Sequence, residues 1–146
     1  MTNDPSSSSA HGVAFAANVS PGVRLGPYEV ESLLGTGGMG SVFRARDTRL
    51  GRAVAIKVCN EQFTGRFTRE ALAISSLNHP NICTLFDVGP NYLVMELVPG
   101  ETLAARLEKG LMEPDAIARL AQQIAAALEA AHAKGVIHRD LSRATL

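Results

Sequence analysis

The sequence lacks several features that direct a protein to particular partners or compartments. It has no tryptophan, only two cysteines, and no run of the roughly 18 apolar residues that a membrane span requires. Its 14 basic and 14 acidic residues cancel, so no net field favours nucleic acid or an anionic membrane surface. Cys59 and Cys83 lie in apolar runs without metal-ligand spacing, and we expect both to be small buried side chains. We therefore expect a cytoplasmic protein that binds no nucleic acid and has no membrane segment in this chain.

Residues 1–25 are expected to form a disordered leader. Four consecutive serines stand among Pro5, Gly12, Pro21 and Gly22, a composition that disfavours a packed core. The segment has an acidic rather than a basic start, and its apolar run over residues 13–17 is too short for a signal peptide.

The rest of the chain predicts strands first and helices afterwards. Residues 28–34 alternate in a way typical of a half-buried strand. Further strands are expected over 41–47, 53–58, 82–89 and 92–97, with one helix over 67–77. Helices over 102–110 and 114–134 follow, the second with Pro114 in its first turn and Gly135 at its end.

This order predicts an α+β fold in two parts. Residues 26–97 would form a five-stranded antiparallel sheet with one helix, and residues 98–146 would begin a helical part. A hinge between them is expected near residues 97–100.

A glycine-rich loop, Gly35-x-Gly37-x-x-Gly40, joins the first two predicted strands. Glycine lets backbone N–H groups approach phosphate oxygens closely. A dinucleotide-binding fold would need a helix directly after the loop, and a Walker loop would need Gly-Lys-Ser/Thr, which is absent. A flexible hairpin remains the alternative, but Val42, two residues beyond Gly40, favours a loop that covers nucleotide phosphates.

Lys57 lies inside the apolar strand AVAIKV, where a charge is costly unless it is paired. It could belong to an edge strand and extend into solvent. The functional alternative needs an anionic ligand and a protein carboxylate. Glu70 could supply that carboxylate because it borders the apolar stripe of the helix predicted over 67–77, although a solvated glutamate is the ordinary alternative there.

With these features, two further motifs resemble those of protein kinases. Val54-Ala55-Ile56-Lys57 is similar to their V-A-I-K strand, and His138-Arg139-Asp140-Leu141 is similar to their H-R-D-L catalytic loop. The segments RLGPYEV, GTGGMGSVFRARDTRLGR and NHPNI resemble in particular bacterial serine/threonine kinases of the eukaryotic-like type. The resemblance covers about residues 25–141 and implies a kinase N-lobe followed by the start of a C-lobe.

The resemblance implies an ATP site and a role for each matching residue. Lys57 would contact the α- and β-phosphates and pair with Glu70, and Asp140 would accept the proton of the substrate hydroxyl. Met95 would gate the back of the pocket, and Ile74, Leu85 and His138 would belong to an internal hydrophobic column. The implied nucleotide contacts are Leu34, Gly35, Thr36, Gly37, Gly38, Met39, Gly40, Ser41, Val42, Ala55, Lys57, Met95, Glu96 and Val98.

The resemblance ends at residue 142. The family continues with Lys-Pro-x-Asn, where the lysine balances phosphoryl charge and the asparagine binds magnesium, whereas this chain has Ser142-Arg143-Ala144-Thr145-Leu146. Codons for Lys-Pro-Gly-Asn shifted by one base encode Ser-Arg-Ala-Thr, and our hypothesis is a frameshift or sequencing error that truncates the catalytic loop. A divergent end or a cut chain are the alternatives. We expect the magnesium ligands to be missing and this chain alone to transfer no phosphate.

Three functions from different classes follow from these observations. The first is a serine/threonine protein kinase that uses ATP, with magnesium, to phosphorylate protein hydroxyls. The alternatives are a non-catalytic nucleotide-binding or dimerisation module and a frameshifted gene remnant. Since apolar residues of helix 114–134 would lack a cover in this chain, we expect residues 102–146 to fray or to associate with a partner through that helix.

Overall fold

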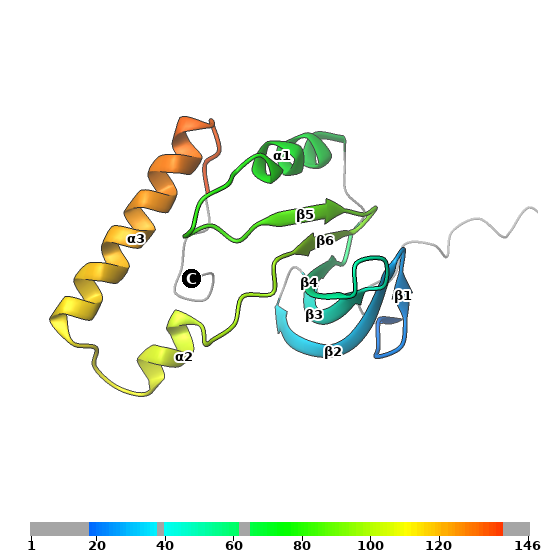
Figure 1. The fold of residues 1–146 in the computed structure, drawn as a ribbon, viewed down its shortest axis with the longest axis horizontal. Helices are drawn as coiled ribbons and strands as arrows, with labels where there is room; N and C mark the ends of the chain where they lie inside the picture. Colours follow the sequence, from blue (N-terminus) through cyan, green and yellow to red (C-terminus); the bar gives the residue numbers. More distant parts are fainter. Residues whose placement is uncertain (1–17, 38–39, 62–64, 139–146) are drawn as a thin grey trace, which may run out of the picture.

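A computed structural model describes residues 18–37, 40–61 and 65–138 of the chain. Their strands form one antiparallel sheet in the order β1-β2-β3-β4-β6-β5 (Figure 1). The strands are β1 (Arg24–Leu25), β2 (Tyr28–Gly37), β3 (Gly40–Asp47), β4 (Arg52–Cys59), β5 (Leu85–Val88) and β6 (Tyr92–Met95). The helices are α1 (Gly65–Ser75), α2 (Leu103–Glu108) and α3 (Pro114–Ala133). The α+β fold is confirmed, with a short sixth strand that the sequence did not predict.

The first predicted strand is buried only in its first half. Tyr28 and Val30 belong to the core, whereas Leu34 is 52% exposed. Two irregularities in the pairing with β3, one after Val30 and one after Leu33, break the alternation of β2. A bulge of this kind shifts which face the following side chains occupy, so the half-buried pattern expected over 28–34 stops at Val30.

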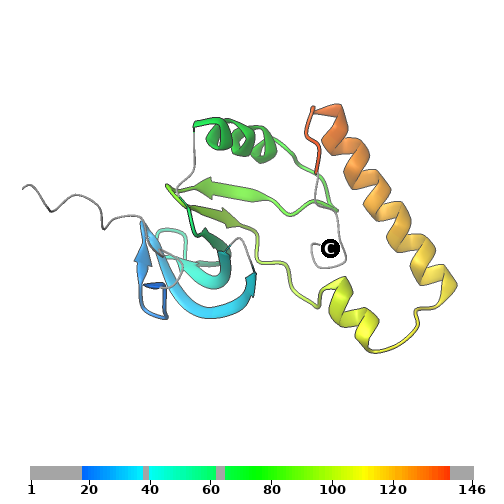
Figure 2. The same cartoon turned by 180° about the vertical axis from the view of Figure 1, so that it is seen from behind.

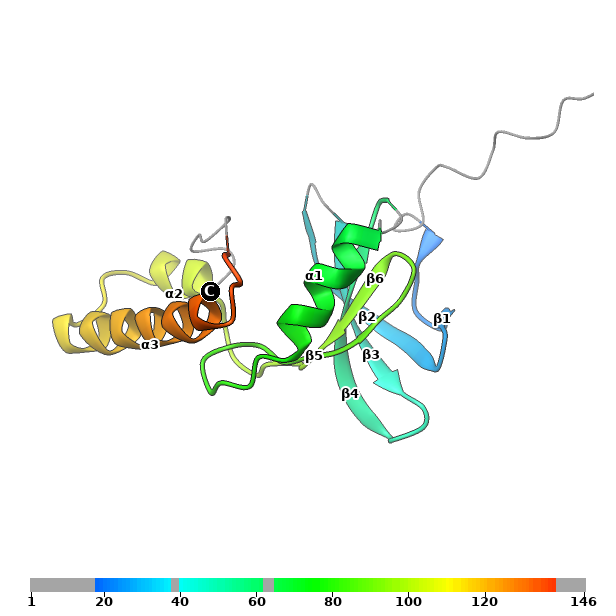
Figure 3. The same cartoon turned by 90° about the horizontal axis from the view of Figure 1, so that it is seen from above.

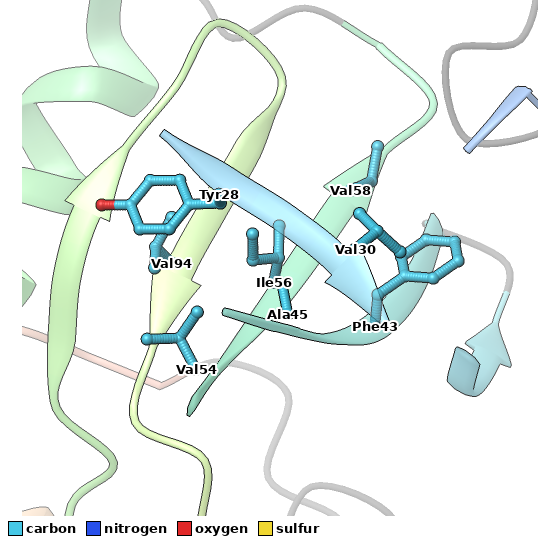
Figure 4. Packing of buried hydrophobic residues seen from close by; sticks show 8 residues of the cluster. All are labelled: Tyr28, Val30, Phe43, Ala45, Val54, Ile56, Val58 and Val94. Atoms are coloured by element: carbon cyan, nitrogen blue, oxygen red, sulfur yellow. The ribbon is translucent and has the colours of Figure 1, made fainter. Parts of the chain in front are cut away.

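The core lies on one face of the sheet and draws on four of its strands, β2, β3, β4 and β6. Figure 4 shows this cluster, in which the Tyr28 hydroxyl points away from the other side chains. Its members are Tyr28, Val30, Phe43, Ala45, Val54, Ile56, Val58 and Val94. Successive side chains of a strand point to opposite faces. Val54, Ile56 and Val58 of β4 face the core, so Ala55 and Lys57 lie on the other face of the sheet.

Helix α1 packs against β5, the strand at one edge of the sheet (Figure 3). Ala71, at the centre of α1, and Leu85, at the start of β5, are both buried in this contact. The helix begins and ends two residues before the range predicted from its apolar stripe. Its packing on β5 means that helix α1 is supported by the edge strand of the sheet.

The two later helices confirm the capping and stop signals predicted for their ends. Thr102 caps α2, since its hydroxyl oxygen accepts a hydrogen bond from the Ala105 amide at 3.1 Å. Pro114 stands in the first turn of α3, and Gly135 follows its end with a φ of 75°.

Helices α2 and α3 form an arm beside the sheet (Figure 2). No residue of α3 is buried, and Ile117, in its first turn, is 52% exposed. No helix in the described part of the chain is long and apolar enough to cross a membrane.

Structure reaches further toward the N-terminus than the predicted boundary at residue 25. Arg24 and Leu25 form β1, which pairs with Glu29 and Tyr28 of β2. The remainder of the predicted leader, residues 1–17, lies outside the described residues.

The two cysteines are less buried than the sequence predicts. Cys59 is half-buried, and Cys83 is exposed. The expectation for Cys83 was wrong because this residue lies in the loop before β5 and not within the strand predicted over 82–89.

Candidate nucleotide-binding site

The pairing of the strands places predicted site residues in two rows on the face opposite the core. The first row, here called the site row, joins Gly35, Val42, Lys57 and Leu93 as successive partners across β2, β3, β4 and β6. The second row joins Ala55 of β4, Met95 of β6 and Leu85 of β5. Since directly paired residues share a face, a ligand above this face would meet both rows. These distant positions in the sequence are thus brought together.

The glycine loop has one position that only glycine can occupy and two that are open. Gly40 has a φ of 147°, and a Cβ there would overlap the carbonyl oxygen of Val58 on β4. A Cβ at Gly35 or Gly37 would meet no atom within 4 Å. Gly40 is therefore required by the packing of β3 on β4, whereas the space beside the other two glycines is available to a ligand.

A weak contact links the two sides of the loop. The Ser41 hydroxyl lies 3.4 Å from the Thr36 hydroxyl oxygen, and these residues are direct partners in β2 and β3. Gly38 and Met39, which the sequence also predicts to contact phosphate, lie outside the described residues.

Lys57 is half-buried in the site row, between Val42 and Leu93 on the neighbouring strands. Its charge also acts on Cys59, two residues further along the same face. Burial raises the pKa of the Cys59 thiol, and the nearby Lys57 ammonium opposes that rise. The lysine thus provides positive charge at the centre of the candidate site.

Glu70 lies on α1 and takes part in the wall of a cavity of about 160 Å³ behind Met95. The walls are mostly apolar and consist of Glu70, Ala71, Ile74, Cys83, Leu85, Leu93 and Met95. Ile74 and Leu85, two predicted members of the hydrophobic column, both line this cavity. The ion pair between Lys57 and Glu70 stays a prediction.

This cavity is smaller than the roughly 300–1,000 Å³ of a typical ligand pocket, so it cannot hold a whole nucleotide. Met95 lines this cavity and is also the direct strand partner of Ala55 in the second row. The role of Met95 as the residue that gates the back of the nucleotide pocket stays a prediction.

The segment after β6 presents backbone groups that are already partly engaged. The Glu96 amide donates to the Thr84 carbonyl at 2.9 Å, and the Cys83 thiol donates to the Glu96 carbonyl at 3.5 Å. A carbonyl oxygen has two lone pairs, so that of Glu96 can accept one further donor, such as an adenine amino group. Val98, the other predicted backbone contact, is 60% exposed.

Cys83 is a site neighbour that sequence reasoning missed. It lies in the wall of the cavity, and its thiol contacts the Glu96 backbone. Although the residue as a whole is exposed, desolvation of its sulfur raises the pKa of the Cys83 thiol, and the Glu96 carboxylate raises it further. No motif marks this position, because the apolar residues around Cys83 resemble an ordinary strand.

The catalytic end of the predicted site is not described. Asp140 and Arg139 lie outside the described residues, and His138, the last residue before them, is exposed. Among the described residues, no group of three or more histidine, cysteine, aspartate or glutamate side chains could hold a metal ion. The described donors therefore do not fit a magnesium site, and the role of Asp140 stays a prediction.

Comparisons with known proteins agree with these motifs. Residues 28–144 match the model of the protein kinase domain. The chain is 40% identical over 136 residues to a probable serine/threonine-protein kinase of Streptomyces coelicolor, covering 83% of this chain and 20% of that protein. It is 41% identical over 137 residues to the serine/threonine-protein kinase PknA of Mycobacterium tuberculosis, covering 82% of this chain and 32% of that protein.

A solved structure of a kinase domain has a similar fold. The kinase domain of Mycobacterium tuberculosis PknI superposes with a TM-score of 0.77 at 26% identity, covering 86% of this chain and 56% of that domain. The chain thus spans about a fifth to a third of these two curated relatives and about half of this solved domain.

Proposed function

Because the chain belongs to the protein kinase family, we propose that it holds ATP for phosphoryl transfer to serine or threonine hydroxyls of a protein substrate. The observation that carries this proposal is the site row, in which the half-buried Lys57 is paired with Val42 and Val42 is paired with Gly35 of the glycine loop. Phosphate oxygens need several backbone donors and a cation within a few ångströms. The row supports the proposal because it places the Lys57 cation on the same face of the sheet as Gly35 of the loop, whose backbone N–H groups would be the donors.

Each part of the proposed site has a distinct task in binding. Gly35 and Gly37 leave room for phosphate to approach the backbone, and the Lys57 ammonium neutralises phosphate charge. Val42 and Ala55 cover the adenine ring, while the Glu96 carbonyl and the Val98 amide pair with its edge. Magnesium, when bound, would supply further charge neutralisation.

Phosphoryl transfer itself is proposed for the whole protein. Transfer depends almost entirely on positioning and on charge neutralisation around the γ-phosphate. Asp140 would accept the hydroxyl proton of the substrate. Ser142, in place of the family lysine, removes one of the charges that favour transfer, so we propose that residues 1–146 alone bind nucleotide without significant turnover.

Calorimetric titration of the purified chain with ATP in EDTA tests the binding. Lys57→Met should weaken ATP binding about 10- to 100-fold, because it deletes a charged hydrogen bond worth roughly 1.5–3 kcal/mol. The same variant should bind adenosine as the original chain does, since adenosine carries no phosphate. Lys134→Met, at the end of α3, is the matched control and should change neither affinity.

The titration also separates the proposal from its alternatives. Equal ATP affinity in the original chain and in Lys57→Met would contradict the proposal. Loss of adenosine binding in Lys57→Met would show that the variant damages the fold rather than the phosphate contact. Radiolabelled phosphate transfer by the 146-residue chain, abolished in Asp140→Asn, would contradict the expected lack of turnover.

A further inference from the structure

The position of helix α1 depends on the edge strand β5. Within the described sheet, β5 forms strand pairing only with β6. Helix α1 packs on β5, and the cavity behind Met95 separates part of α1 from β6. Glu70 is therefore carried by a helix whose main support is a four-residue strand. Any displacement of β5 would displace Glu70 relative to Lys57.

The pairing of β5 with β6 is interrupted at its centre. Leu85 is paired with Met95 and Asp87 with Val94, which leaves Phe86 in an irregularity of the register. Such a break removes part of the ladder that would otherwise fix the strand. Contacts from outside the β5–β6 pair can therefore decide where this strand lies.

Two side chains from other parts of the sheet act at this interruption. The Tyr28 hydroxyl, from the start of β2, donates to the Asp87 carboxylate at 2.7 Å. The Arg52 guanidinium, from the start of β4, lies 3.9 Å above the centre of the Phe86 ring. Both contacts cross strand β6 in the order of the sheet, so they tie the edge to its interior.

Tyr28 is itself held by a partly buried network, in which the linking Arg49 side chain is 57% exposed. Its ring is 2% exposed within the core, and the Arg49 guanidinium donates to the Tyr28 hydroxyl oxygen at 3.1 Å. Arg49 in turn pairs with Asp47, which is 1% exposed and also accepts the Arg49 backbone N–H at 3.0 Å. The donor of the contact to Asp87 is thus anchored on the β3–β4 turn.

We propose that the Tyr28–Asp87 hydrogen bond is a tether that positions α1 through β5. Tyr28 and Asp87 are then positioning residues, and their effect on nucleotide reaches the site through Glu70. A hydrogen bond to a carboxylate is stronger than one between neutral groups, and Tyr28 cannot move because its ring is packed in the core. The effect on nucleotide rests on the proposed function, whereas the effect on α1 does not.

Hydrogen exchange on the nucleotide-free chain tests the tether directly. Tyr28→Phe keeps the ring and removes the hydroxyl, and it should speed amide exchange in α1 and β5 about five-fold, the equivalent of one hydrogen bond. Asp87→Ala should do the same, whereas Asp87→Asn, which keeps an acceptor oxygen, should restore most of the protection. Thr48→Val removes a hydrogen bond of the same 2.7 Å length, to Pro27, and should leave α1 unchanged.

The exchange pattern can overturn the inference. Unchanged exchange in α1 for Tyr28→Phe would refute the tether. Equal acceleration in α1 and in the β2–β3 hairpin would also refute it, because that pattern indicates a general loss of stability.

Nucleotide affinity supplies the second readout. In Tyr28→Phe, ATP affinity should fall about three- to five-fold while adenosine affinity stays unchanged. The reason is that only the phosphates contact Lys57, which Glu70 would hold in position. A parallel fall in both affinities would contradict a positioning role. If the original chain bound neither ligand, the proposed function would fail while the exchange experiment still decided the tether.

Discussion

Among single residues, the glycines of the loop have different reasons for being glycine. Gly40 is required by the close Val58 carbonyl and by its positive φ, whereas Gly37 borders open space. Gly40→Ala should therefore lower the free energy of unfolding by more than about 2 kcal/mol. Gly37→Ala should change it by less than about 1 kcal/mol but should weaken ATP binding, because a methyl group would hold phosphate away. Urea unfolding and ATP titration of both variants measure the two effects.

The Tyr28 hydroxyl makes stability depend on pH in the alkaline range. Burial, assisted by its hydrogen bond to Asp87, raises the pKa of Tyr28 to about 12. Between pH 10 and 12 the unfolded chain loses this proton while the folded chain keeps it, so stability falls as pH rises through that window and is fully present below it. The loss is at most about 3 kcal/mol.

Chemical unfolding of the original chain and of Tyr28→Phe at pH 9 and pH 11.5 measures this loss. The difference in unfolding free energy between the two proteins should shrink at the higher pH. A constant difference would show that Tyr28 titrates normally.

Individual site residues could be predicted where a motif fixed both residue type and spacing, and their roles stay predictions. Lys57, Val42 and Ala55 were predicted on this basis, and the structure places them on one face of the sheet. The contact of Cys83 with Glu96 could not be predicted, because it depends on how the loop before β5 folds back on the segment after β6. The spacing of the two residues in the sequence does not indicate that they are in contact.

At the scale of elements, local signals predicted the helices more closely than the strands. Thr102, Pro114 and Gly135 are capping or stop signals whose physical effect is confined to one turn, so the ends of α2 and α3 were predicted to within about two residues. The irregularities in β2 and β5 depend on the register with a partner strand, which no signal within a single strand reports. For the same reason the two-residue strand β1 was missed.

Helix α3 is expected to be weakly protected in the 146-residue chain. None of its residues is buried, whereas Val54, Ile56 and Val58 of β4 are fully covered. Helical stability in proteins comes mainly from packing of the apolar face. Amides of α3 should therefore exchange much faster than those of β4 when followed by mass spectrometry. Strong protection at Ile124 and Leu128 in a monomer would contradict this expectation.

For the molecule as a whole, the sheet with α1 and the arm of α2 and α3 differ in how far they are packed. The buried core cluster comes entirely from strands β2, β3, β4 and β6. The family could be predicted from the sequence because its motifs lie at well-separated positions in the expected order. The relative placement of Lys57 and Glu70 could not, because it depends on the support of α1 by a strand at the sheet edge.

The site row also constrains the order of events as the chain folds. Its residues at positions 35 and 42 lie on one hairpin, and local hairpins form within about 1–10 μs. Leu93 joins the row only when β6 pairs with β4, which closes a loop that contains α1 and β5. Loop-closure entropy makes such non-local pairing slower. The glycine loop should thus acquire its shape early, whereas the complete nucleotide-binding surface should appear only in a late kinetic phase.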